Sequence, residues 1–133
     1  MVLVDSTAWI GFLRGEEGPA VRRLRRLLEA GEAAVAPVIV QEVLQGATSP
    51  QAFRTLRAEF ALLPLLGAEG GSTLHEAAAE LYARCRWRGI TPRSPNDCLV
   101  AVTALHHDVP LLHDDRDFEH LATVVPRLRL MRG

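Results

Sequence analysis

Acidic residues stand at four separated points of the chain where a carboxylate has a chemical use or needs a partner: Asp5, Glu42, Asp97 and Asp115. Asp5 ends an apolar run, and Asp115 follows another apolar run by three residues. We therefore expect both at the carboxyl ends of strands, where ligands bind in a parallel sheet. Asp97 is expected in the first turn of a helix that Ser94 caps, with Pro95 at the first helical position. Glu42 lies within the apolar sequence VIVQEVL, where an ionised carboxylate is costly unless it has a partner.

Carboxylates gathered in one place would predict a site for a hard divalent cation. Three or four of them repel one another and raise one another's pKa values. Mg²⁺ or Mn²⁺ relieves this repulsion because both ions prefer oxygen ligands. The five histidines show no zinc-ligand spacing beside these acids. Two such ions can activate a water and stabilise both the entering and the leaving oxygen of a phosphodiester. The acids thus predict a metal-dependent phosphodiesterase.

Each acid also has an ordinary structural explanation. Asp5 can cap a helix, and Asp97 has the capping-box spacing from Ser94. Glu42 can point to solvent from a helix that is buried on its other face. The acids after the second apolar run can form a solvated turn: Asp114, Asp115 and Asp117. One shared site explains all four positions with a single cause, whereas the structural explanations require four coincidences.

The elements that must position these acids alternate along the chain. Short apolar runs predict strands over 2–4, 33–36, 62–66, 110–112 and 128–130. Pro64 places the third of these at a sheet edge. Helical spacing and capping residues predict helices over 6–13, 19–30, 37–45, 50–61, 72–88, 98–107 and 118–122. Strands alternating with helices predict an α/β fold, with a parallel sheet covered on both faces, in one domain over residues 1–133.

Composition removes several classes of protein. The 133 residues carry a formal net charge of -1, and all 15 basic residues are Arg. The absence of Lys excludes P-loop nucleotide hydrolysis, Schiff-base chemistry and phospho-aspartate sites that require a lysine.

No apolar stretch approaches the ~18 residues of a membrane span. The first residues lack the pattern of a signal peptide, so we expect a cytoplasmic protein, with Cys85 and Cys98 as small core residues.

Four segments, in order, resemble a PIN domain of the VapC toxin ribonuclease type: VLVDSTAWI, PVIVQEVLQG, SPNDCLVAVTAL and LLHDDRDFEHL. The resemblance covers nearly the whole chain and implies an α/β/α sandwich around a mainly parallel sheet. By position it implies a catalytic cluster of Asp5, Glu42, Asp97 and Asp115, with Asp5, Asp97 and Asp115 as ligands of Mg²⁺ or Mn²⁺. It implies supporting roles for Ser6, Thr7, Asn96 and Asp117, with Thr7 or Ser6 holding a ligand or water near Asp5.

One position departs from the family pattern. His113 stands where the family more often has Thr or Ser, in the pattern T-x-D-x-D-F. A histidine there can contact phosphate or water, or it can be a buried, neutral residue, and we favour the second interpretation.

The resemblance also implies a substrate and partners. The substrate would be single-stranded or looped RNA, hydrolysed by a metal-activated water to leave a 5'-phosphate and a 3'-hydroxyl. The partners would be a cognate antitoxin protein that plugs the site and a second copy of the chain in a homodimer. The near-neutral charge limits RNA contact to a local surface. The candidates for that surface are Arg84, Arg86, Arg88 and Arg93, for which a solvated helix face and loop is the alternative.

Other functions compete with the toxin hypothesis. A PIN nuclease for RNA maturation or decay would have no antitoxin. A non-catalytic interaction module would use the acids only to bind a structural ion or to cap helices. An aspartyl-nucleophile phosphatase ranks last, because Asp5 lacks an acid two residues later and the chain has no lysine.

Overall fold

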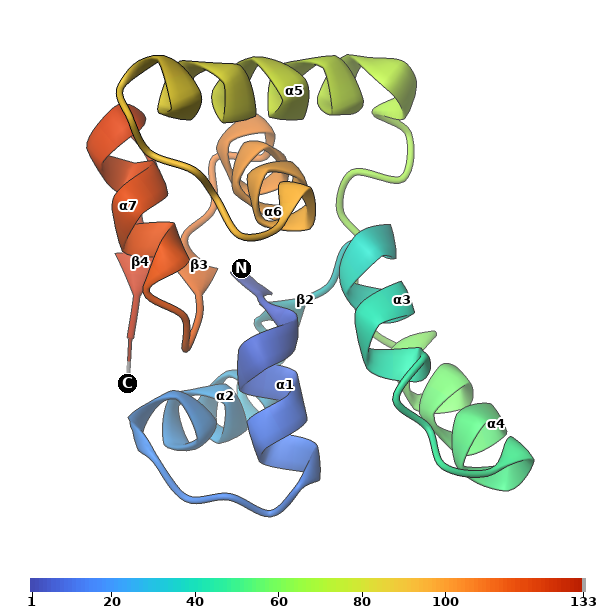
Figure 1. Ribbon diagram of the computed structural model, residues 1–133. Helices are drawn as coiled ribbons and strands as arrows, with labels where there is room; N and C mark the ends of the chain where they lie inside the picture. Colours follow the sequence, from blue (N-terminus) through green and yellow to red (C-terminus); the bar gives the residue numbers. More distant parts are fainter. Residues whose placement is uncertain (133) are drawn as a thin grey trace.

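A parallel sheet of four short strands lies at the centre of the computed structural model, which describes residues 1–132 (Figure 1). The strands are β1 (Val2–Val4), β2 (Ala33–Ala34), β3 (Leu111–Leu112) and β4 (Leu130–Met131), in the order β2-β1-β3-β4. The chain leaves β1 first for one neighbour, β2, and later for the other, β3. The strand order therefore reverses between β1 and β3, the place where α/β folds bind ligands.

Strands β1, β2 and β3 are buried because their sequences are apolar on both faces, as expected for a covered parallel sheet, whereas the edge strand β4 is partly exposed. Leu3 and Val4 of β1 pair with Leu111 and Leu112 of β3, and all four side chains are fully buried. Burial of such side chains contributes about 1.5–3 kcal/mol each. This packing fixes the ends of β1 and β3 next to each other, and with them the residues that follow.

Helices cover both faces of the sheet, as predicted. α1 (Ser6–Leu13) and α2 (Pro19–Glu29) pack together on one side. α5 (Gly71–Trp87), α6 (Pro95–His106) and α7 (Asp117–Val124) pack together on the other, with α5 lying across α6 in Figure 1. α3 (Pro37–Leu44) contacts both α1 and α6 and carries α4 (Pro50–Phe60) at the side of the molecule. The fold is thus the expected α/β/α sandwich.

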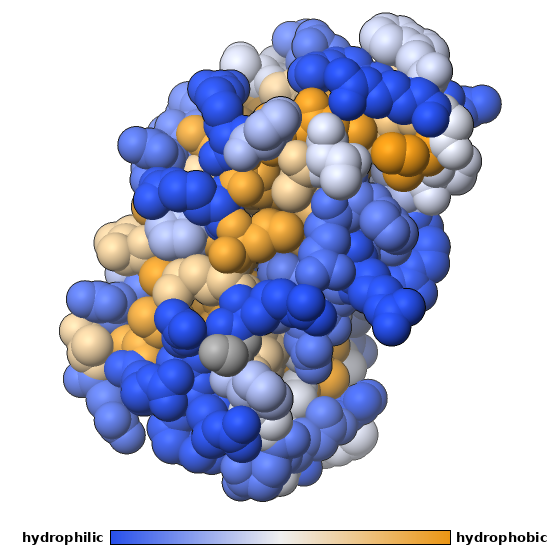
Figure 2. Space-filling view, turned by 90° about the vertical axis from the view of Figure 1, so that its left-hand side faces the viewer, coloured by the Kyte–Doolittle hydropathy of each residue, from blue (hydrophilic) through white to orange (hydrophobic). Residues whose placement is uncertain are grey.

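One face of the molecule combines hydrophilic and apolar side chains. Figure 2 shows the face on the side of β4 and the C-terminal end, where a band of apolar side chains crosses between hydrophilic ones. Cys85 and Cys98 are free and buried, as predicted. Within residues 1–132, none of the helices combines the length and the apolar character needed to cross a lipid bilayer.

The strand predicted over 62–66 was wrong. In its place Leu65 forms a single parallel bridge with Val35, beside β2. The amide of Val35 donates to Pro64 O, and the amide of Leu66 donates to Val35 O. Pairing does not extend further, because proline has no N–H to donate and Leu62 is 86% exposed. The predicted position at a sheet edge was confirmed.

The helices next to the acids begin at or near their predicted starts. α6 begins at Pro95, as the Ser94 cap and the proline at the first helical position predict, and Ser94 accepts the Asn96 N–H. α7 begins at Asp117 and runs to Val124 instead of covering 118–122. Asp97 and Asp117 thus lie in the first turns of helices, where the helix dipole favours negative charge.

Candidate metal centre

The acidic residues come from three elements that meet at the carboxyl edge of the sheet. Asp5 directly follows β1, and the turn 113–117 directly follows the neighbouring strand β3. The amide of Asp5 donates to Leu112 O, which joins the two chain segments at this point. Asp97 lies in the first turn of α6, close enough to Asp5 and Asp115 for their charges to act on its carboxyl.

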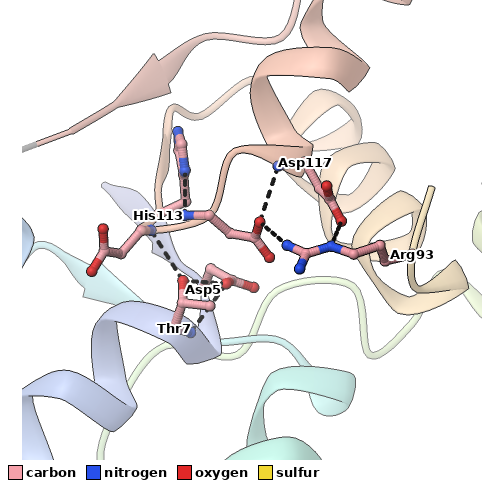
Figure 3. A network of polar contacts seen from close by, with 7 residues as sticks. Asp5, Thr7, Arg93, His113 and Asp117 are labelled. Carbon is pink, nitrogen blue, oxygen red and sulfur yellow. Dashed lines mark hydrogen bonds and ion pairs between the residues drawn. The ribbon is translucent and has the colours of Figure 1, made fainter. Parts of the chain in front are cut away.

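Asp5 is held in a fixed orientation although it is only 2% exposed. It caps α1, and its Oδ2 accepts hydrogen bonds from the Thr7 amide at 3.1 Å and the Thr7 hydroxyl at 2.6 Å (Figure 3). Burial raises the pKa of Asp5, and the hydrogen bonds from Thr7 oppose this rise because they favour the ionised form. Asp5 is thus a buried carboxylate that the start of α1 positions.

Thr7 also connects the two sides of the site. Its Oγ1 donates to Asp5 and accepts a 3.0 Å hydrogen bond from the backbone N–H of Asp114, in the turn after β3. One hydroxyl therefore fixes the carboxylate that follows β1 and the turn that follows β3. Thr7, predicted to support a ligand or water near Asp5, lies between two segments of the protein and bonds to both.

Three carboxylates form a compact cluster: Asp97, Asp115 and Asp117. One oxygen from each lies within 4.8 Å of an oxygen of the others, which suits one cation held by several oxygen ligands. Burial, followed by the charge on Asp5, raises the pKa of Asp97 to about 7, and the charges on Asp115 and Asp117 add to this effect. The raised pKa of Asp97 thus reflects both its burial and its proximity to other carboxylates. The donor set and its charge both fit a divalent cation.

Backbone hydrogen bonds shape the turn that carries two of these acids. Oδ1 of Asp115 accepts the Asp117 N–H at 3.0 Å, and Nδ1 of His113 accepts the Asp115 N–H at 3.1 Å. The ring of His113 is 2% exposed and lies 5.3 Å, centroid to centroid, from the ring of Phe118. Burial lowers the pKa of His113, which keeps the ring neutral with Nδ1 free to accept. The favoured interpretation of a buried histidine was thus confirmed, and its work is to hold the Asp115 turn.

Glu42 lies on α3, half-buried, on the Asp5 side of the site. Burial raises the pKa of its carboxyl, the charge on Asp5 raises it further, and hydrogen bonds from the side chains of Ser6 and Asn96 oppose the rise. These interactions explain how an acid is tolerated in the apolar segment VIVQEVL. The structure brings Glu42 close enough to Asp5 for charge coupling but does not include it in the compact three-carboxylate cluster.

Of the four arginines expected to contact RNA, Arg93 lies at the acidic cluster. Its Nη2 pairs with Oδ1 of Asp115 and its Nε with Oδ2 of Asp117, each at 2.8 Å (Figure 3). Arg84 and Arg88 donate instead to backbone oxygens at the end of α7, Val124 O and Thr123 O. Arg86 is exposed near the end of α5. The structure thus separates one arginine at the site from two that secure α7.

Sequence reasoning missed two features of this site. Asp117 was expected as a supporting acid, yet its carboxylate lies within the compact cluster in place of the more deeply buried Asp5. The D-x-D spacing after β3 was the available signal, because the Asp117 amide bonds to Asp115 and the turn brings both side chains together. The pairing of Arg93 with residues 22 and 24 positions later had no sequence signal.

Comparison with known proteins gives consistent matches over almost the whole chain. The family model for the PIN domain matches residues 2–124. The chain is 36% identical over 126 residues to VapC ribonuclease Mb1587 of Mycobacterium bovis and, by the same figures, to ribonuclease VapC11 of Mycobacterium tuberculosis, covering 93% of this chain and 93% of each relative.

Solved structures share the fold at lower identity. VapBC2 from Rickettsia felis, bound to a DNA fragment from its promoter, matches with a TM-score of 0.74 at 14% identity, over 100% of this chain and 99% of that one. DNA-bound VapBC from Salmonella typhimurium matches with a TM-score of 0.72 at 17% identity, over 98% of this chain and 96% of that one. On the family model and the curated relatives together, this chain belongs to the PIN domain family.

Proposed function

We propose that this chain is a metal-dependent endoribonuclease of the VapC type, acting in the cytoplasm as the toxin of a toxin–antitoxin pair. The observation that carries the proposal is the compact carboxylate cluster of Asp97, Asp115 and Asp117 beside the buried Asp5, at the point where the strand order reverses. Relatives named as VapC ribonucleases, 36% identical over 93% of the chain, support the RNA substrate.

We assign the cluster to Mg²⁺, with Mn²⁺ as its substitute. All the donors are carboxylate oxygens, which suit hard cations better than zinc. A cation bound nearby would lower the pKa of the Asp97 carboxyl from about 7 and so favour its ionised form. When bound, such a cation supplies Lewis acidity to the phosphodiester and activates water for attack.

The side chains of the protein have separate proposed roles in metal binding, positioning and proton transfer. Asp97, Asp115 and Asp117 hold the cation. Asp5 faces the site as a carboxylate whose direction is fixed by Thr7. The raised pKa of Glu42 suits a group that exchanges a proton with the attacking water, and Asn96 orients Glu42 through its hydrogen bond. Attack on phosphorus then leaves a 5'-phosphate and a 3'-hydroxyl.

RNA contact is proposed to be local. The chain has a formal net charge of -1, so it lacks the charge excess for a broad phosphate-binding surface. Arg93 stands at the acidic cluster and Arg86 is exposed at the end of α5, and these two are the arginines best placed to meet phosphates. Arg84 and Arg88 contribute by holding the end of α7.

The partners are an antitoxin protein and a second copy of the chain. Solved proteins with this fold include a toxin–antitoxin complex from Klebsiella pneumoniae, which supports the first partner. A groove between α3 and α4 has a mostly apolar lining, with one arginine, that suits an amphipathic helix of such a protein: Pro37, Val40, Arg57, Phe60, Ala61, Leu63 and Leu65. The homodimer is proposed from the resemblance to the VapC type.

Cleavage of a mixed, structured RNA pool by the purified chain tests the proposed activity. Samples contain Mg²⁺, Mn²⁺ or EDTA, and the Asp97→Asn variant is run in parallel. Asp114→Asn is the matched control, because Asp114 lies in the same turn but its carboxylate is outside the cluster. We expect products with 5'-phosphates from the wild type and Asp114→Asn, and none with EDTA or from Asp97→Asn. Cleavage that survives both EDTA and Asp97→Asn would refute the proposal.

The biological role is tested separately from the chemistry. Expression with the neighbouring reading frames of the source genome, followed by purification of the tagged chain, should recover a small protein that blocks RNA cleavage. An active nuclease without such an inhibitor would be an RNA-processing PIN enzyme. A chain that neither cleaves RNA nor binds Mn²⁺, after removal of any bound inhibitor, would be a non-catalytic interaction module.

A further inference from the structure

The guanidinium of Arg93 occupies the same carboxylates that the proposed cation needs (Figure 3). Asp115 and Asp117 are its two ion-pair partners, and they are also two of the three acids whose oxygens approach within 4.8 Å. A guanidinium and a divalent cation therefore compete for one set of oxygens.

The hydrogen bonds at Asp115 make this competition direct. Its Oδ1 accepts from Arg93 Nη2 at 2.8 Å and from the Asp117 N–H at 3.0 Å, which together use both lone pairs of that oxygen. A cation that binds Oδ1 must displace one of these donors. A cation that binds the other oxygen, Oδ2, lies within a few ångströms of the guanidinium, where like charges repel. In either case the contact with Arg93 is the one that yields, because the backbone donor is fixed by the turn.

Arg93 can be released from the acids, and the side chain stays near the site afterwards. The side chain of Arg93 is 73% exposed, so water can solvate the released guanidinium, whereas the side chains of Asp115 and Asp117 are only 18% and 12% exposed and need another cation in its place. Its backbone remains in place because the next residue, Ser94, caps α6 through the Asn96 N–H. The guanidinium can therefore leave the acids by side-chain rotation alone.

We propose that Arg93 exchanges partners: it pairs with Asp115 and Asp117 in the metal-free protein, is displaced by the divalent cation, and then binds an RNA phosphate at the same edge of the sheet. The inference rests on the proposed nuclease function. The planar guanidinium presents two parallel N–H donors to a phosphate as it does to carboxylates. Metal and RNA then strengthen each other's binding, because each favours the state in which Arg93 has left the acids.

Manganese titration without RNA measures the first half of the exchange. Isothermal titration calorimetry compares the wild type with Arg93→Gln, Arg93→Lys and Arg116→Gln. Arg116 is the matched control because it lies between the same two acids in the sequence, is exposed, and has no ion pair with either in the described part of the chain. We expect Arg93→Gln to bind Mn²⁺ about fivefold more tightly than the wild type, and Arg116→Gln to change the affinity much less.

The Arg93→Lys variant separates the effect of bridging two carboxylates from the effect of positive charge alone. Lysine keeps the positive charge but cannot join two carboxylates through a planar fork. We expect its Mn²⁺ affinity to lie between those of the wild type and Arg93→Gln. An affinity equal to that of the wild type would mean that charge alone is responsible and would overturn the exchange.

RNA-binding measurements test the second half of the exchange, in which the released Arg93 binds an RNA phosphate. Fluorescence anisotropy of a labelled single-stranded RNA is recorded in an Asp5→Asn background, in which the three-carboxylate cluster is intact and cleavage is expected to be absent. We expect Mn²⁺ to tighten RNA binding severalfold when Arg93 is present and to have little effect when Arg93→Gln is added. Equal tightening with and without Arg93→Gln would overturn the phosphate-binding step.

These experiments distinguish failure of the proposed Arg93 exchange from failure of the proposed metal-dependent nuclease function. If the wild type binds Mn²⁺, Asp97→Asn does not, and Arg93→Gln binds with unchanged affinity, the metal site stands and the exchange is wrong. If neither the wild type nor Arg93→Gln binds Mn²⁺ better than Asp97→Asn, the metal site is wrong and both proposals fail.

Discussion

Oγ1 of Thr7 lies 2.6 Å from Oδ2 of Asp5, so that a buried carboxylate takes its direction from the hydroxyl two residues later. The same oxygen accepts the Asp114 N–H, which makes Thr7 the link between the chain after β1 and the chain after β3. The order of the site thus depends on a residue that is not itself an acid.

Thr7→Val should impair catalysis more than stability. Valine keeps the shape of threonine but removes both hydrogen bonds of the hydroxyl, at a cost of about 1 kcal/mol in unfolding free energy. We expect kcat for RNA cleavage to fall about tenfold, because, of the two hydrogen bonds from Thr7, Asp5 keeps only the one from the residue 7 amide and is held less firmly. Steady-state kinetics and thermal unfolding measure the two effects. Thr7→Ser should restore most of the rate, and equal rates for the Val and Ser variants would contradict the positioning role.

Asp5→Asn should abolish cleavage and leave the fold intact. Asparagine caps helices as well as aspartate does, so the cap of α1 is kept. The substitution also replaces the buried Asp5 carboxyl, whose pKa is raised by burial, with a neutral amide. We expect at least a hundredfold loss of cleavage with a thermal midpoint within a few degrees of the wild type. Asp5→Ala removes the cap of α1 as well and should be about 1 kcal/mol less stable than Asp5→Asn in denaturant unfolding.

Asp97→Asn should stabilise the metal-free protein in a pH-dependent way. The folded-state pKa of Asp97 is raised from 3.8 to about 7, so the folded protein holds this proton more tightly than the unfolded chain. Ionisation therefore penalises the fold, and the penalty grows as pH rises from 3.8 and levels off above about 7. We expect the thermal midpoint of Asp97→Asn to exceed that of the wild type by a few degrees at about pH 8 and by less at about pH 5.

Two comparisons check the cause of this stabilisation. Asp114→Asn should show no such gain, because its carboxylate lies outside the cluster. Mn²⁺ should raise the midpoint of the wild type, since a ligand of the native state stabilises it, and should leave Asp97→Asn nearly unchanged. A gain for Asp97→Asn that is the same at both pH values would show that the stabilisation does not come from the carboxyl charge.

His113→Thr and His113→Val should differ in activity although both remove the ring. In the native turn Nδ1 of His113 accepts the N–H of Asp115, two residues later. A threonine hydroxyl can accept the same N–H, whereas valine, with nearly the same shape, cannot. Both variants lose the packing against Phe118, at a cost of about 2–4 kcal/mol. We expect cleavage by the Thr variant to exceed that by the Val variant about tenfold at a temperature where both are folded.

This comparison also explains why His113 departs from the family pattern without loss of the turn. The more usual Thr or Ser and the histidine of this chain have one capacity in common, which is to accept a hydrogen bond from the amide two residues later. Equal activity of the two variants would mean that this hydrogen bond does not order Asp115.

The positions of Asp5 and Asp115 could be predicted from sequence, because β1 and β3 are short, apolar and bounded by polar residues. Parallel pairing then brings the residues after both strands to one edge. The strand over 62–66 could not be predicted correctly, because its apolar composition resembles that of the true strands. What decides against it is the missing N–H of Pro64 and a neighbour, β2, of only two residues.

The partners of Arg93 lay beyond sequence reasoning for a different reason. A basic residue before a helix has many possible neighbours, and its pairing with Asp115 and Asp117 depends on where the turn after β3 lies in space. The roles of Arg84 and Arg88 were hidden in the same way, since they bind backbone oxygens that every residue possesses. Long-range contacts of flexible side chains follow from the fold and not from spacing.

Thr7 and Asp114 are 107 positions apart in the sequence, and this separation determines when the site can form during protein synthesis. A ribosome that has made only the first strand and its helices has produced Asp5 and Glu42 but none of the compact carboxylate cluster. Asp115 and Asp117 are translated long after Asp5, and they reach their places only when β3 pairs with β1. A nascent chain that has not yet reached residue 117 therefore carries no complete carboxylate cluster.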